Sequence, residues 1–81
     1  MSKTKYIKTK DKQIIVFSEY YTHDQFSNFE PISAGFISIG TETQGDIDCR
    51  CYGDSVSLGL KADEKEDTEL ARQQILGYSY F

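Results

Sequence analysis

Runs of β-branched and aromatic residues, separated by short polar turns, predict five β-strands in this sequence. The strongest signal is the stretch 13–18, Gln-Ile-Ile-Val-Phe-Ser, which contains no residue that breaks a strand. A continuous run of this kind is typical of a central strand that is covered on both faces. The other expected strands lie at 4–10, 32–42, 46–52 and 55–60. Gly35 lies inside the third strand and predicts a bulge or a close approach of another backbone segment.

Two of the expected strands, 46–52 and 55–60, alternate between apolar and polar residues. Because side chains along a strand point to alternate faces, this pattern assigns the positions that face the core. The expected inward residues are Ile47, Cys49, Cys51, Val56, Leu58 and Leu60. Ser55 and Ser57, which lie between them, are expected to face outward.

Two other segments carry helical spacing. Thr22 and Gln25 have the spacing of a capping box, which predicts a helix of about two turns that ends before Pro31. A second helix is expected to begin after Asp63 or Asp67 and to run to about residue 76. The acidic residues at its start are interpreted as a solvated first turn. Its expected apolar stripe is Leu70, Ala71, Gln74, Ile75 and Tyr78.

The element order is therefore β-β-α-β-β-β-α, which predicts an α+β fold. Short turns between consecutive strands indicate an antiparallel sheet of about five strands, with two helices packed on one face. The chain has 81 residues, which is enough for one domain, 1–81, and too few for two separate cores. A chain of this length buries only about 60–65% of its unfolded surface, so we expect modest stability.

Charge is distributed unevenly along the chain. Residues 1–12 hold five lysines and one aspartate, a net charge of +4, whereas residues 13–81 hold four basic and twelve acidic residues, a net charge of −8. The acidic body disfavours a nucleic-acid partner, because phosphates repel it. The lysine strip is interpreted as keeping an edge strand soluble, with phosphate binding as the alternative. It consists of Lys3, Lys5, Lys8, Lys10 and Lys12.

The sequence carries no motif of a known catalytic or cofactor site. His23 is the only histidine, and it is interpreted as a surface or capping residue rather than as a general base. Cys49 and Cys51 are interpreted as small core residues rather than as zinc ligands or nucleophiles. There is no P-loop, dinucleotide fingerprint or nucleophile elbow. We therefore expect a protein that is not an enzyme and has no cofactor or metal.

Two expected strands combine glycine with small polar residues, which are poor strand formers. These are the segments Ser33–Phe36 and Gly53–Leu60. Either they allow close packing against the sheet, or they form a polar floor that contacts a ligand or partner. The candidate binding residues are Ser33, Gly35, Phe36, Asp54, Ser55 and Ser57, together with His23.

The same segments carry a resemblance to a family of small uncharacterised proteins from phages and mobile elements of bacteria, notably gut Bacteroidetes. The shared pattern corresponds here to Ile14–Phe17, His23, Ser33–Phe36, Gly53–Leu60 and Asp63–Leu76. The chain departs from it at Lys61-Ala62-Asp63, where the family pattern has Ser-Arg-like residues, so no basic contact is expected there. The resemblance implies no enzymatic activity. It implies an accessory role for a phage or mobile element, directed against host defence.

These observations favour a non-enzymatic, cytoplasmic binding module that contacts a host protein or holds a small anionic ligand. One alternative is an acidic inhibitor that mimics nucleic acid, and a second is a small hydrolase that uses His23 and a carboxylate. No membrane partner is expected, because no apolar run approaches the length of about 20 residues that a bilayer requires. Self-association is expected through the apolar tail Tyr78–Phe81 or through an edge of the sheet.

Overall fold

The structure is a computed structural model that describes residues 4–41 and 47–77. In chain order its elements are β1 (Thr4–Thr9), β2 (Ile14–Ser18), the 3-10 helix η1 (His23–Phe29), β3 (Pro31–Thr41), β4 (Ile47–Tyr52), β5 (Asp54–Ser55), β6 (Leu60–Lys61) and α1 (Glu64–Gln74). The predicted α+β fold with an antiparallel sheet is confirmed. The predicted single sheet of five strands is wrong, because the strands form a four-stranded sheet and a separate two-stranded one.

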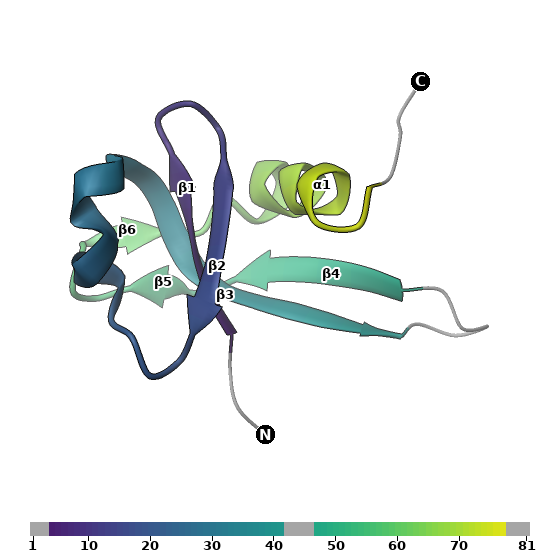
Figure 1. Ribbon diagram of the computed structural model, residues 1–81, viewed down its shortest axis with the longest axis horizontal. Helices are drawn as coiled ribbons and strands as arrows, with labels where there is room; N and C mark the ends of the chain where they lie inside the picture. Colours follow the sequence, from purple (N-terminus) through teal and green to yellow (C-terminus); the bar gives the residue numbers. More distant parts are fainter. Residues whose placement is uncertain (1–3, 42–46, 78–81) are drawn as a thin grey trace.

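The long strand β3 joins the two halves of the four-stranded sheet, whose order is β2-β1-β3-β4. Its first half pairs with β1, with Ala34 opposite Ile7, and its second half pairs with β4, with Ile37 opposite Cys51. Figure 1 shows the result: the β1–β2 hairpin stands upright, while β3 and β4 run away from it side by side. The sheet is therefore strongly twisted, and each end of β3 has different neighbours.

The structure reverses the predicted positions of the first two strands. The lysine-rich β1 is an inner strand between β2 and β3, whereas the apolar β2 is an edge strand. An inner position is tolerated because the Lys8 side chain, although buried, meets carboxylates from α1. The residue types of the two strands favoured the opposite arrangement. They do not show that a helix far along the chain supplies those carboxylates.

The segment expected to be a strand at 55–60 is a tight hairpin instead. Only Asp54–Ser55 and Leu60–Lys61 pair as strands, and a turn lies between them. Gly59 adopts a left-handed φ of 67°, and its N–H donates to the Ser55 carbonyl at 2.9 Å. The expected orientations are reversed at its start, where Val56 is 91% exposed and Ser55 is buried, whereas Leu58 and Leu60 pack against the core as expected and Ser57 is exposed.

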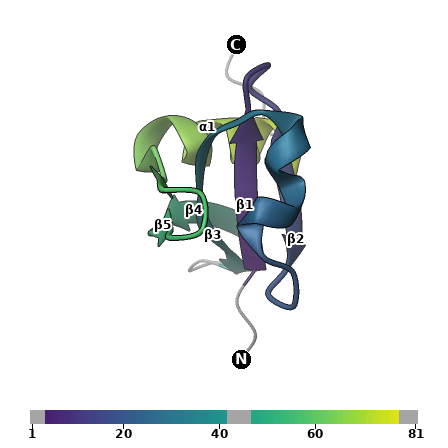
Figure 2. The same cartoon turned by 90° about the vertical axis from the view of Figure 1, so that its left-hand side faces the viewer.

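Both faces of the four-stranded sheet are covered, so the helices do not share one face as predicted. Under α1 the buried cluster consists of Tyr6, Ile37, Cys49, Cys51 and Ala71. On the opposite face the buried cluster of Ile7, Phe17 and Ala34 packs against Phe26 of η1 and against Leu58 and Leu60 of the β5–β6 hairpin. Figure 2 shows η1 standing beside the β1–β2 hairpin. The inward orientation of both cysteines is confirmed, while the Ile47 side chain lies outside the described residues.

The predicted starts of both helices and the end of the first agree with the structure, while α1 ends at Gln74, before the expected position near residue 76. Gln25 Oε1 accepts a hydrogen bond from the Thr22 N–H at 2.8 Å, and η1 ends at Phe29, before Glu30 in a left-handed conformation. Asp63 is the N-cap of α1, and its side chain accepts from the Glu66 N–H at 3.3 Å. No helix among residues 4–41 and 47–77 has the length and apolar character needed to cross a bilayer.

The buried face of α1 is more polar than its sequence pattern predicted. Its buried residues are Asp67, Thr68 and Ala71, whereas Ile75 of the expected stripe is partly exposed and Gln74 is exposed. Tyr78 lies outside the described residues. The interpretation of Asp67 as part of a solvated first turn is therefore wrong, and its burial shapes the polar network described below.

Candidate functional site

The seven candidate binding residues are distributed over three places in the fold. Ser33 lies under α1, while His23 of η1 contacts Gly35 and Phe36 of β3. Asp54, Ser55 and Ser57 belong to the β5–β6 hairpin. This hairpin packs on the same face of the sheet as Ala34, so the two glycine- and serine-bearing segments are neighbours. They do not form one common polar surface.

His23 is a buried core residue, which corrects its interpretation as a surface or capping residue. Its Nε2 lies 2.9 Å from the carbonyl oxygen of Gly35, and because a carbonyl only accepts, this nitrogen carries the proton. The ring packs edge-on against Phe17 and Phe36, with centroid distances of 5.4 and 6.0 Å. The imidazole therefore ties η1 to β3.

Gly35 and Phe36 lie where β3 meets the start of the hairpin. A Cβ atom at Gly35 would lie 2.4 Å from the carbonyl oxygen of Tyr52, so the predicted close backbone approach is confirmed. The Phe36 ring stacks on Tyr52 with a centroid distance of 5.8 Å. Both residues serve the packing of the sheet against the following segment.

Ser55 stabilises the hairpin turn from within. Its hydroxyl oxygen accepts a hydrogen bond from the Leu58 N–H at 3.3 Å and lies 3.3 Å from the Ser57 hydroxyl. A serine that bonds the backbone three residues further on is a common turn element. The exposed Asp54 precedes it. The serines of this segment are thus accounted for by the local turn.

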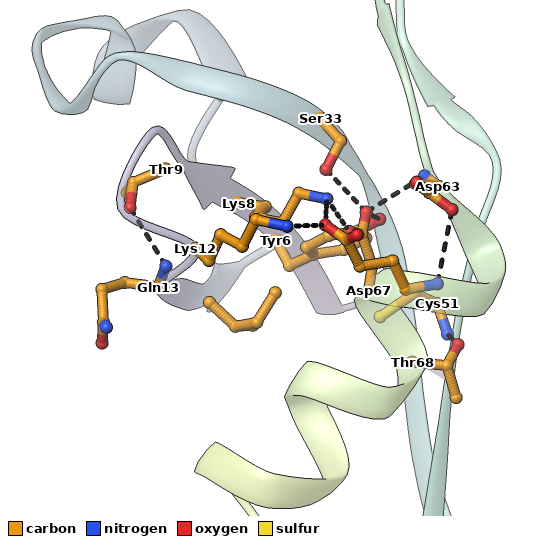
Figure 3. A network of polar contacts seen from close by, with 12 residues as sticks. Tyr6, Lys8, Thr9, Lys12, Gln13, Ser33, Cys51, Asp63, Asp67 and Thr68 are labelled. Carbon is orange, nitrogen blue, oxygen red and sulfur yellow. Dashed lines mark hydrogen bonds and ion pairs between the residues drawn. The ribbon is translucent and has the colours of Figure 1, made fainter.

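The most extensive polar cluster is a buried network around Asp67, shown in Figure 3. Asp67 is 0% exposed, and its Oδ2 accepts from the Tyr6 hydroxyl at 2.5 Å and the Ser33 hydroxyl at 2.6 Å. The Asp63 N–H donates to the same oxygen at 3.1 Å, and Lys8 Nζ lies 2.8 Å from Oδ1. Oδ2 therefore accepts three hydrogen bonds, whereas Oδ1 makes none with the described residues and is held by the ion pair with Lys8.

Lys8 brings a second carboxylate to this network. Its Nζ lies 2.6 Å from Glu66 Oε1, which also accepts from Lys12 Nζ at 3.2 Å. Burial disfavours the charged ammonium, but the contacts with Asp67 and Glu66 outweigh it and raise the pKa of Lys8. The hydrogen bonds from Lys8 and Lys12 lower the pKa of Glu66. The network is therefore charged and paired.

The environment of these groups fits a role in stabilising the fold. Burial, followed by the hydrogen bond to Asp67, raises the pKa of Tyr6, so its hydroxyl remains a neutral donor. Asp67 and Tyr6 are both completely buried, so a substrate has no direct access to either group. Sequence reasoning missed the network, although a polar helix face beside a lysine-bearing strand was a signal for it.

The two thiols lie on the α1 side of the sheet, where their surroundings make them unreactive. Burial, followed by repulsion from the Asp67 carboxylate, raises the pKa of Cys51 to about 12. Burial also raises the pKa of Cys49. Because the thiolate is the reactive form, both environments oppose nucleophilic chemistry. This agrees with the interpretation of both residues as core residues.

We expect neither thiol to react with a thiol-specific reagent at pH 8 while the protein is folded. At a pKa of about 12, only about one Cys51 side chain in ten thousand is a thiolate at this pH. In guanidinium chloride, where burial is lost, two equivalents should react per chain. Rapid modification of folded protein, followed spectrophotometrically, would contradict the assignment.

Three exposed aromatic side chains lie at η1 and in the turn before it. We name Tyr20, Tyr21 and Phe29 the aromatic patch; these side chains are 89%, 51% and 50% exposed. Phe26 lies between two of these rings and the core, with ring centroids 4.1 Å from Phe17, 6.3 Å from Tyr21 and 6.2 Å from Phe29. Tyr21 and Phe29 thus stand on the stacked pair of Phe17 and Phe26, and Tyr20 directly precedes Tyr21.

Hydrogen bonds hold the backbone of the aromatic patch in place. Lys5 Nζ donates to the Tyr21 carbonyl at 2.9 Å, and the Tyr21 N–H donates to the Ser18 carbonyl at 3.1 Å. The Gln25 side chain fixes the start of η1, as described above. Sequence reasoning interpreted Phe26 and Phe29 as one helix face, but it did not predict that Phe29 would stay exposed.

No cluster of three or more potential metal ligands occurs among the residues that the structure describes. The described cysteines and the histidine are separated by the sheet, because the thiols belong to the α1 face and His23 to the opposite side. No protein-family model, curated protein or solved structure matches the chain.

Proposed function

We propose that this protein is a non-enzymatic binding module that contacts a partner protein through the aromatic patch. The observation that carries the proposal is the exposure of Tyr20, Tyr21 and Phe29, with Tyr21 and Phe29 packed on the stacked pair of Phe17 and Phe26. Large aromatic side chains contribute most of the energy at many protein interfaces, because they bury much surface with few rotatable bonds. A patch whose backbone is already fixed loses little further entropy on binding.

The charges at the two ends of η1 suggest the character of the partner. Asp24 lies in the first turn of η1 and Glu30 follows its last residue, and both are exposed. A partner with an apolar centre and a basic rim would complement this surface. This polarity also agrees with the net acidic character of the chain after residue 12.

A partner protein is favoured over a small anionic ligand. Ser33 donates its hydroxyl hydrogen to the Asp67 carboxylate, and Ser55 bonds within its own turn. An anion at Ser33 would also have to replace that carboxylate and enter a buried region. The aromatic patch needs no such rearrangement.

The resemblance to phage and mobile-element proteins supports a bacterial host protein as the partner. In this proposal the chain acts in the host cytoplasm, and occupation of a host-defence protein is its accessory role. No covalent chemistry is required, which agrees with the structural roles of His23, Lys8 and the two cysteines.

The proposal is tested by replacing the patch residues and measuring capture of a host protein. We expect Tyr20→Ser and Phe29→Ser each to reduce affinity about 30-fold, which corresponds to the loss of a residue worth about 2 kcal/mol. The measurement is quantitative pull-down from lysate, followed by titration with the identified partner. Tyr20→Ser should leave the melting temperature unchanged, since this side chain is almost fully exposed.

Val56→Ser is the matched control, because Val56 is an exposed apolar residue on the separate β5–β6 hairpin. Capture should be unaffected by this change. Equal losses for Val56→Ser and the patch variants, or full capture by the patch variants, would overturn the proposal.

A further inference from the structure

The two edges of the four-stranded sheet differ in the availability of their backbone groups. At the β4 edge, the N–H of Cys49 donates to Asp48 Oδ1 at 2.8 Å, and the N–H of Cys51 donates to Thr68 Oγ1 at 2.9 Å. In an antiparallel pair, alternate residues direct both backbone groups away from the partner strand. Because side chains already occupy both donors, the β4 edge is a poor template for another strand.

The outward-facing residues of β2 follow from the hairpin. The Thr9 N–H donates to the Gln13 carbonyl at 2.9 Å, so the alternation directs the backbone groups of Ile14, Val16 and Ser18 away from β1. Two of these groups have partners within the chain. The Ile14 N–H donates to Gln74 Oε1 at 2.8 Å, and the Ser18 carbonyl accepts from the Tyr21 N–H at 3.1 Å.

From this pattern we propose that two copies of the chain pair antiparallel through β2, with Val16 of each copy opposite Val16 of the other. This register joins the N–H and carbonyl of each Val16 in two reciprocal hydrogen bonds. It also joins each Ser18 N–H to the Ile14 carbonyl of the second copy. The two further bonds of an ideal ladder would need the Ile14 N–H and the Ser18 carbonyl, which are the groups already bonded within each chain. The edge is thus self-complementary.

The side chains favour the same register. Val16 is 36% exposed, and in this pairing its side chain meets its own counterpart across the two-fold axis. Since the pairing is short, we expect a weak dimer that depends on concentration.

The pairing would have a consequence for the arrangement of binding surfaces. A two-fold axis perpendicular to the sheet keeps equivalent faces of the two copies on the same side. The two η1 helices, and with them the two aromatic patches, would face one way. Two linked weak contacts can then act together on a partner that offers two sites.

Sedimentation equilibrium combined with amide hydrogen exchange tests the pairing on the full chain up to about 1 mM. We expect the mean mass to rise toward twice the monomer mass with concentration. Protection of the Val16 and Ser18 amides should rise in parallel at least tenfold, because these become donors between copies. The Ile14 amide should show no such change, since Gln74 holds it in the monomer.

Val16→Lys should abolish association by placing two like charges at the axis, while Val56→Lys, on the exposed hairpin turn, should leave it intact. Circular dichroism verifies that both variants fold. A wild-type chain that stays monomeric throughout, association that survives in Val16→Lys, or protection that rises elsewhere than at β2 would each overturn the proposal. The separate capture experiment on the aromatic patch does not depend on this result.

Discussion

Replacement of Asp67 by alanine is expected to lower the free energy of unfolding by about 3–5 kcal/mol, because it removes one partner of a buried ion pair. Lys8 would keep its charge in a buried position, and the Tyr6 and Ser33 hydroxyls would lose their acceptor. Proteins have a total stability of about 5–15 kcal/mol, so the variant loses a large part of it and, for a chain of modest stability, should be close to unfolded at room temperature. Urea denaturation followed by circular dichroism measures the change.

A double-mutant cycle separates the ion pair from the rest of the network. Lys8→Met alone should also be strongly destabilising, because it leaves the Asp67 carboxylate buried with one fewer partner. Lys8→Met combined with Asp67→Leu should cost less than the sum of the two single changes, since neither charge then remains unpaired. Additive costs in the cycle would show that the two groups are not coupled.

Glu66→Gln is the matched control on the same helix. Glu66 also contacts Lys8, but its side chain is 39% exposed, so water can replace the lost interaction. We expect little change in stability from this substitution. A loss as large as that of Asp67→Ala would place the energetic centre of the cluster at the protein surface rather than under α1.

Local signals in the sequence were sufficient for much of the fold. The strand at 13–18, the Thr22–Gln25 spacing and the Asp63 cap each depend on residues a few positions apart. The same is true of the inward orientation of Cys49 and Cys51. Such features could be predicted because the interacting groups are neighbours along the chain.

The errors concern contacts between distant segments. Lys8 and Asp67 are far apart in sequence, so neither the burial of the lysine nor the inner position of β1 could be inferred from its strand alone. The alternation at 55–60 fitted a strand as well as a hairpin, and the left-handed conformation of Gly59 decided between them. The exposure of Phe29 escaped prediction because the same spacing in η1 serves both the half-buried ring of Phe26 and an exposed one.

Replacement of Gly35 by alanine is expected to destabilise the fold by about 3 kcal/mol, at the upper end of the range for overpacked sites. The added Cβ would lie 2.4 Å from the Tyr52 carbonyl oxygen and 3.2 Å from Ala62 Cβ. A backbone oxygen cannot rotate away as a side chain can, so β3 and the end of β4 must separate. This movement would also disturb the Gly35 carbonyl, which accepts the hydrogen bond from His23.

Gly40→Ala is the control, because Gly40 lies in the same strand and its Cβ would meet nothing within 4 Å. This change should alter the free energy of unfolding by no more than about 1 kcal/mol. Alanine lowers the conformational entropy of the unfolded chain, and where this effect dominates the variant should be slightly more stable than the wild type. Thermal and urea unfolding of both variants measure the contrast. Similar stabilities for the two variants would mean that the contact between Gly35 and Tyr52 relaxes at little cost, and that the glycine in this segment is not required for close packing.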